Sequence, residues 1–257
     1  MRPQGDLGES MQQESTEHPE MPERRAFADR PVPNMVLRLG VMALGMANIA
    51  FGIAISRATD LGLAAISSVP GVINYAAPAV SLGTATFVFN VLLVILQIVL
   101  LRRQFKWPQL LSIPFVLVFS AMIDLFVPVA NAIPMGSYPA RLLFCLVSCA
   151  FIAFGVWVQA KAALIMLPGD GLAWTVGTVF RMPFGKAKMA TDITILATAA
   201  VLSLVLMGGL FGVREGSVVA AFLVGFLVRC LNRMFPQAAR FIPAEGHITW
   251  IPKNDAE

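Results

Sequence analysis

Six long apolar segments, each close to the length that an α-helix needs to cross a bilayer, dominate this sequence. They cover residues 36–56, 84–101, 109–130, 142–160, 189–208 and 217–235. About 20 predominantly apolar residues span the hydrocarbon core of a membrane, because a helix rises roughly 1.5 Å per residue. A soluble fold would have to bury six helices with almost no polar face. We therefore expect an all-α, polytopic membrane bundle of six transmembrane helices, with the lipid bilayer as its surroundings.

The charge of the chain supports this class. Only 13% of the residues are charged, against about 25% in a typical soluble domain. The net charge of +4 does not indicate nucleic-acid binding, because it divides unevenly along the chain. Residues 1–34 hold four basic and seven acidic residues and lack an apolar run. We expect them to form a disordered cytoplasmic tail rather than a signal peptide, and residues 236–257 to form a second cytoplasmic tail.

Basic residues mark one side of the predicted bundle. The opposite loops hold only Arg57, Arg141 and Arg214. Lys and Arg accumulate in cytoplasmic loops, so we expect both termini to face the cytoplasm. The residues on the basic side are Arg24, Arg25, Arg30 and Arg38 near the first segment, Arg102, Arg103 and Lys106 after the second, Arg181, Lys186 and Lys188 before the fifth, and Arg233 and Arg240 after the sixth.

A tetrapeptide, Ile-Ala-Phe-Gly, occurs twice, at residues 49–52 and 152–155. The match continues further along the chain. Asn90 and Asp192 each follow a glycine by seven residues, and they are separated by nearly the same number of residues as the two tetrapeptides. We interpret residues 35–130 and residues 131–235 as two copies of one membrane repeat.

Each predicted half contains three spans, which is an odd number. The second half must therefore enter the membrane the other way up. This predicts a 3+3 inverted-topology repeat, an arrangement typical of secondary transporters. Its two copies are related by a pseudo-two-fold axis in the membrane plane.

Two connecting segments, residues 61–77 and 167–180, are too apolar for solvated loops. Irregular backbone at membrane depth is tolerated only where protein or a watery cavity covers it. They are either broken, re-entrant segments, one from each side, or amphipathic helices lying flat at the interface. In the first case, the candidate hinges are Gly62, Pro70 and Gly71 in one segment and Pro168, Gly169 and Gly171 in the other.

Several short motifs resemble a known family. They are Asp60-Leu61-Gly62, Leu167-Pro168-Gly169-Asp170-Gly171-Leu172, Arg214-Glu215-Gly216-Ser217-Val218-Val219 leading to Gly225, and Asp124 near the end of the third span. Over about residues 38–235 the chain resembles the YczE/YitT-like integral membrane proteins of bacteria. The resemblance implies a multi-pass protein of the bacterial inner membrane. It implies no particular activity, because the family has no agreed biochemical function.

Polar side chains inside the apolar segments are the candidate functional residues. An ionisable group at mid-bilayer costs at least about 2.5–3.5 kcal/mol, so its presence needs a reason. The candidate substrate or ion pathway consists of Asn90, Asp124, Asp170, Asp192 and Arg229.

Depth decides which of these groups can meet. Asp124 lies about six residues from the outer end of the third span and Arg229 about six residues from the inner end of the sixth. They are thus roughly 12 Å apart in depth, which is too far for an ion pair. We therefore predict the pairs Asn90–Asp124 toward the outside and Asp192–Arg229 toward the inside. In the alternative interpretation, Arg229 extends to the cytoplasmic headgroups and Asp192 lies near Lys188 at the start of the fifth span.

The sequence contains no motif of an enzyme, such as HExxH, GxSxG or a Walker loop. Cys145, Cys149 and Cys230 are interpreted as buried apolar residues, and we expect no metal, no cofactor and no catalytic activity. The leading hypothesis is a small-solute transporter or permease with its substrate between the halves. The alternative is a non-catalytic accessory protein that supports a neighbouring membrane enzyme or complex. Substrate, direction, coupling ion and oligomeric state stay open.

Overall fold

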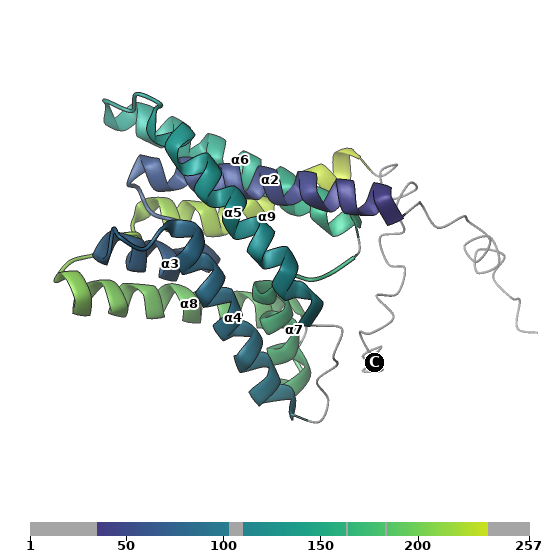
Figure 1. Ribbon diagram of the computed structural model, residues 1–257. Helices are drawn as coiled ribbons and strands as arrows, with labels where there is room; N and C mark the ends of the chain where they lie inside the picture. The colour runs from purple at the N-terminus through teal and green to yellow at the C-terminus, as the bar shows by residue number, and fades with distance from the viewer. Residues whose placement is uncertain (1–34, 103–109, 163, 183, 236–257) are drawn as a thin grey trace, which may run out of the picture. The chain divides into compact units, whose positions relative to one another are not determined.

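The computed structural model describes residues 35–102, 110–162, 164–182 and 184–235, and these residues form eight helices without a strand (Figure 1). The predicted tails, residues 1–34 and 236–257, lie outside the described residues. The helices are α2 (Met35–Thr59), α3 (Ala65–Ala76), α4 (Leu82–Leu101), α5 (Ser112–Asn131), α6 (Tyr138–Ala162), α7 (Pro168–Phe180), α8 (Phe184–Met207) and α9 (Glu215–Met234).

Five of these helices are long and apolar enough to cross a membrane, namely α2, α4, α5, α6 and the part of α8 from Lys186 to Met207. The chain is thus a multi-pass membrane protein. The sixth predicted span corresponds to α9, which has 20 residues but is not among the five. Glu215, Arg229 and Arg233 make it less apolar than the others. Its passage through the membrane stays a prediction.

The two unusual connecting segments each contain a short helix. α3 has 12 residues and α7 has 13, about half the length that crosses a bilayer. All residues from Ser67 to Val72 are buried. A helix lying flat on a membrane keeps one exposed face, so this burial favours insertion of α3 into the bundle. Pro70 and Gly71 lie inside α3 without ending it. The helical structure is therefore interrupted before Ala65 rather than at these residues.

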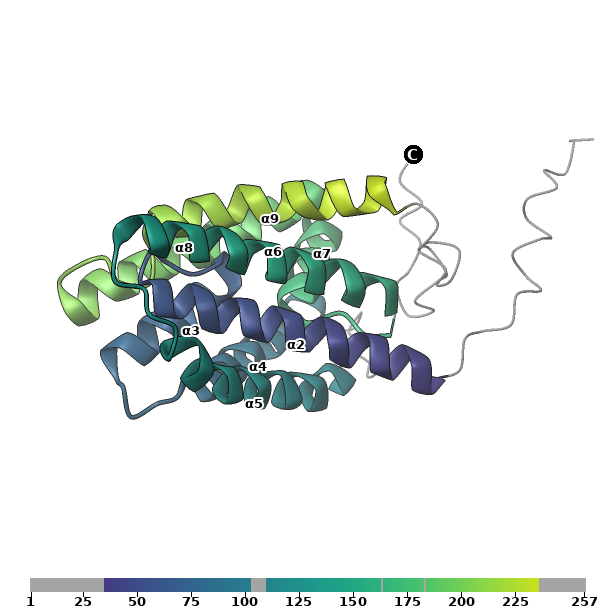
Figure 2. The same cartoon turned by 90° about the horizontal axis from the view of Figure 1, so that it is seen from above.

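The helices form two layers. In one layer α5, α2, α6 and α9 lie side by side in this order, as the view from above shows (Figure 2). The other layer contains α3, α4, α7 and α8, in which α3 packs on α8 and α4, and α7 packs on α4 and α8. α4 and α5 join the layers. Each short helix therefore packs against a long helix of the other half of the sequence.

The repeated tetrapeptides meet where α2 and α6 cross. A Cβ atom added at Gly52 would lie 2.6 Å from Cγ1 of Ile152, and one added at Gly155 would lie 2.7 Å from Cγ1 of Ile49. The same Cβ at Gly155 would lie 2.6 Å from the carbonyl oxygen of Gly45. Rising numbers in α2 meet falling numbers in α6, so the two helices are antiparallel. Only glycine allows their backbones to approach this closely.

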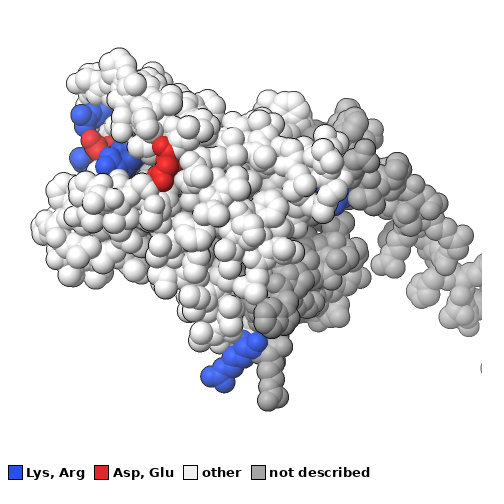
Figure 3. Space-filling view, in the orientation of Figure 1, with Lys and Arg blue, Asp and Glu red and all other residues white. Residues whose placement is uncertain are grey.

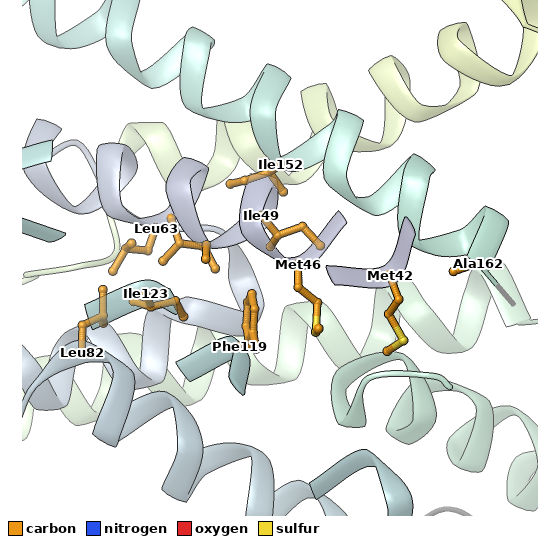
Figure 4. Packing of buried hydrophobic residues seen from close by; sticks show 11 residues of the cluster. Met42, Met46, Ile49, Leu63, Leu82, Phe119, Ile123, Ile152 and Ala162 are labelled. Atoms are coloured by element: carbon orange, nitrogen blue, oxygen red, sulfur yellow. The ribbon is translucent and has the colours of Figure 1, made fainter. Parts of the chain in front are cut away.

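The main apolar core follows α2 along its length (Figure 4). Met42, Met46 and Ile49 of α2 contact Phe119 and Ile123 of α5 and neighbouring apolar residues. These side chains are less than one tenth exposed. The tight α2–α6 crossing and this core together hold α5, α2 and α6 in one layer.

Candidate functional site

The non-helical segment before α3 is hydrogen-bonded to the second half of the sequence. The backbone N–H of Leu63 donates to the carbonyl of Gly212 at 3.0 Å, and that of Gly216 donates to the carbonyl of Leu61 at 2.8 Å. Between them Gly62 has a φ of +111°, a conformation that residues with a side chain rarely adopt. Gly62 thus lies in a non-helical turn that is hydrogen-bonded to the loop before α9, while its role as a hinge stays a prediction.

A cluster of charged residues covers the same end of the bundle, where α2 ends and α9 begins (left in Figure 1). We call this the Asp60 cluster: Arg57, Asp60, Tyr75, Arg141 and Arg214. The Tyr75 hydroxyl donates to the Asp60 carboxylate at 2.7 Å, and guanidinium nitrogens of Arg57 and Arg141 lie 3.7 and 4.0 Å from it. Arg214 donates to the Asp60 carbonyl oxygen at 3.2 Å. Figure 3 shows basic and acidic side chains gathered at this end of an otherwise mostly uncharged face.

A side-chain amide from the first half of the sequence forms a hydrogen bond with the first turn of α7. Nε2 of Gln97, a buried side chain of α4, donates to the carbonyl of Pro168 at 3.0 Å. A Cβ atom at Gly171 would lie 2.8 Å from Oε1 of the same amide. A Cβ atom at Gly169 would lie 2.6 Å from Cδ1 of Ile66, in the first turn of α3. The first turns of the two short helices therefore contact each other.

Three charged residues form an ion cluster at the opposite end of the bundle, near the start of α8. Nζ of Lys188 lies 3.2 Å from a carboxylate oxygen of Asp170 and 2.9 Å from one of Asp192. The predicted partner of Asp192, Arg229, instead donates to the carbonyl of Gly225 on its own helix at 3.2 Å. Asp192 therefore follows the alternative interpretation, with Lys188 as its partner. Asp170 and Asp192 come together because one lysine lies between α7 and α8.

Asp124 binds the beginning of another helix. Its carboxylate accepts hydrogen bonds from the Ser81 hydroxyl at 2.6 Å and from the backbone N–H of Gly83 at 2.7 Å. A carboxylate is favourable there, because the first N–H groups of a helix have no partner within the helix. The predicted partner of Asp124, Asn90, is buried and donates to the carbonyl of Thr86 one turn earlier. The Asn90–Asp124 hydrogen bond that we predicted is not among the contacts of these described residues.

Replacement of Asp124 by alanine should destabilise the protein by about 1–2 kcal/mol, because it leaves the Gly83 N–H without an acceptor. Ser120 provides the matched control one turn earlier on α5. Its hydroxyl is buried and has no partner among the described residues, so Ser120→Ala should have little effect. The midpoint of thermal unfolding in detergent measures both changes. Equal midpoints for the two variants would contradict this role of Asp124.

An apolar groove of about 410 Å³ lies between α4, α7 and α8, with Val69 of α3 at its side. Its polar residues are Thr191, Thr194 and Thr198 of α8. Each threonine hydroxyl donates to a carbonyl of its own helix at 2.8 Å, which leaves only oxygen lone pairs for a ligand. The five candidate pathway residues, all within the described chain, do not line it. The apolar lining residues include Phe89, Leu93, Leu96, Leu100, Leu172, Val176 and Phe180.

Sequence reasoning did not predict all the partners of Asp60, Lys188 and Gln97, which organise these sites. In the sequence Asp60 stands out only as part of a short motif, and the arginines around it only as the few basic residues of the opposite loops. Their convergence on one carboxylate is not predicted. The sequence places Lys188 near Asp192 in the alternative interpretation, but not near Asp170. Gln97 is one amide in an apolar helix, and only the path of α7 gives it a partner. Within the described ranges, no three His, Cys, Asp or Glu side chains lie together as metal ligands would.

Comparison with known proteins gives a family but no activity. A family model described as DUF6198, a family of unknown function, matches residues 36–233. No curated protein and no solved structure matches the chain. The family match covers the same region as the resemblance to YczE/YitT-like proteins, which itself stays a prediction.

Proposed function

We propose that this chain, which belongs to DUF6198, a family of unknown function, is a permease for a small apolar or amphipathic solute. In this proposal it has six spans, including α9, and two halves of opposite orientation, with both termini in the cytoplasm. The observation that carries the proposal is the exchange of short helices: α3 of the first half packs on α8, and α7 of the second half packs on α4.

The contacts at the α2–α6 crossing support the inverted repeat. Exchanging the two copies turns the contact of Gly52 with Ile152 into that of Gly155 with Ile49. Such reciprocity is what a two-fold axis generates between identical surfaces. The contact between Ile66 and Gly169, which share the same offset, follows the same rule. Two half-length helices that meet inside a bundle are a frequent plan for transporter sites.

The groove supports the class of solute. It is bounded by α3 and α4 of one half and by α7 and α8 of the other, where a permease needs its binding site. Its apolar lining disfavours a strongly polar solute, which would lose hydrogen bonds to water without replacement. Asp124 binds the start of α4, and Asp170 and Asp192 both bind Lys188. None of these three ionisable candidates therefore lines the groove.

Flux through liposomes tests this function. Purified protein is first screened for thermal stabilisation by apolar and amphipathic metabolites, and hits are then tested for protein-dependent flux. Thr194→Phe, which fills the groove, should reduce flux at least about tenfold. Val205→Phe on the same helix, 76% exposed and outside the groove, should not. A screen without hits and liposomes without flux would favour the accessory role, for which the exposed Phe222 and Phe226 of α9 offer a lateral surface.

A further inference from the structure

Each of the three helices that line the groove, α4, α7 and α8, has a basic residue just beyond its last lining residue at one end of the groove. Leu100 of α4 lines the groove and Arg102 follows two residues later; Phe180 of α7 lines it and Arg181 follows. Ala190 of α8 also lines it, and Lys186 lies one turn earlier on the same face. The three cations therefore flank the end of the groove where α4 and α7 end and α8 begins.

These three basic residues differ from their neighbours in lacking a partner. Within the described chain, Arg102, Arg181 and Lys186 are exposed and make no side-chain hydrogen bond or ion pair. The carboxylates nearest in sequence to Arg181 and Lys186, those of Asp170 and Asp192, are both bound by Lys188. By formal charge the Asp170, Asp192 and Lys188 cluster offsets one of the three positive charges, so among the described residues this end of the groove stays positive and available to an anion.

The groove itself fits a hydrocarbon chain. Its volume of about 410 Å³ is within the range of ligand pockets. The hydroxyl protons of its threonines are already engaged, so a polar group inside it would find no donor. It opens sideways, since Leu96 and Phe180 are 43% and 63% exposed. An apolar groove with a lateral opening and a cationic end matches an amphiphile with an anionic head.

We infer that the groove binds an anionic phospholipid, with one acyl chain between α4 and α8 and the phosphate against Arg102, Arg181 and Lys186. The inference rests on the proposed function, because it uses its groove and its orientation, in which this end of the groove faces the cytoplasmic leaflet. Basic pockets between transmembrane helices on that side are a known means of holding anionic headgroups.

Lipid binding by the purified full chain tests this site. Phosphatidylglycerol and phosphatidylcholine with identical acyl chains are titrated into protein in an uncharged detergent, and bound lipid is counted by native mass spectrometry. We expect phosphatidylglycerol to bind roughly tenfold or more tightly than phosphatidylcholine. The triple variant Arg102→Gln, Arg181→Gln, Lys186→Gln should abolish this preference. A variant with Lys161→Gln and Arg233→Gln, which changes basic residues on α6 and α9, should keep it.

Groove-filling variants separate the chain from the headgroup. Thr194→Phe should weaken phosphatidylglycerol binding several-fold, whereas Val205→Phe should not. Glycerol phosphate, which has no acyl chain, should neither bind nor compete. Equal binding of the two lipids, an unaltered triple variant, or full competition by glycerol phosphate would each overturn the inference. Specific lipid binding without flux would refute the permease and leave the lipid site standing, while flux of another solute without lipid preference would do the reverse.

Discussion

Replacing Gly155 with alanine is expected to lower the stability of the folded protein by about 2–3 kcal/mol. The new methyl group would lie 2.6 Å from the carbonyl oxygen of Gly45 and 2.8 Å from the backbone nitrogen of Ile49. Backbone atoms cannot turn away as a side chain can, so α2 and α6 must separate along their crossing. Because the main core follows α2, this separation also loosens contacts with α5.

Glycine-to-alanine changes elsewhere in α2 provide the control. No atom lies within 4 Å of a Cβ built at Gly40, so Gly40→Ala should leave stability unchanged or raise it by up to about 1 kcal/mol. Gly45→Ala, whose Cβ would lie 2.9 Å from backbone atoms of α6, should behave like Gly155→Ala. Size-exclusion profiles and unfolding midpoints in detergent would show the contrast. A Gly155→Ala protein as stable as Gly40→Ala would refute the close crossing.

Replacing Lys188 with methionine should destabilise the protein by about 3 kcal/mol. It leaves two carboxylates, Asp170 and Asp192, close together without their shared cation. Breaking a fully buried ion pair costs about 3–5 kcal/mol. We expect the lower end of this range, because the Lys188 side chain is 32% exposed.

Removal of the two negative charges should rescue this variant. Lys188→Met combined with Asp170→Asn and Asp192→Asn keeps the shapes of the side chains but has no unpaired charge. We expect it to recover most of the lost stability, and the difference between the variants measures the coupling of the cluster. A single variant, Asp192→Asn, serves as the reference for loss of one carboxylate. If the triple variant were as unstable as Lys188→Met, charge repulsion would not be the cause.

The sequence predicts the helices of this protein better than the contacts of its polar residues. Apolar length alone locates five membrane-crossing helices, because in a bilayer hydropathy and span coincide. Helix ends are less well predicted: α8 begins at Phe184 rather than at residue 189, since Lys186 and Lys188 belong to the helix although they are not apolar. The repeated tetrapeptide predicted a relation between halves, and its glycines lie at the α2–α6 crossing.

The sequence predicts contacts of the candidate residues only from their depth in the membrane, and depth alone does not determine which residues meet. Depth predicts that Asp124 and Arg229 do not meet, and each has another partner in the structure: Ser81 for Asp124 and the carbonyl of Gly225 for Arg229. It does not tell which face of a helix a residue occupies. Asp124 therefore meets the start of α4 rather than Asn90, and Asp192 meets Lys188. The groove escaped prediction for the same reason, because its lining depends on how four helices pack.

The hydrogen bonds of the non-helical segment before α3 bear on when its native structure can form during synthesis. Leu61 and Leu63 are synthesised before their partners, Gly216 and Gly212, which follow about 150 residues later in the sequence. Until then these backbone groups lack their native partners. The native structure of this segment therefore forms only after the second half has been translated. The two halves expressed as separate chains should thus reach their native structure only together.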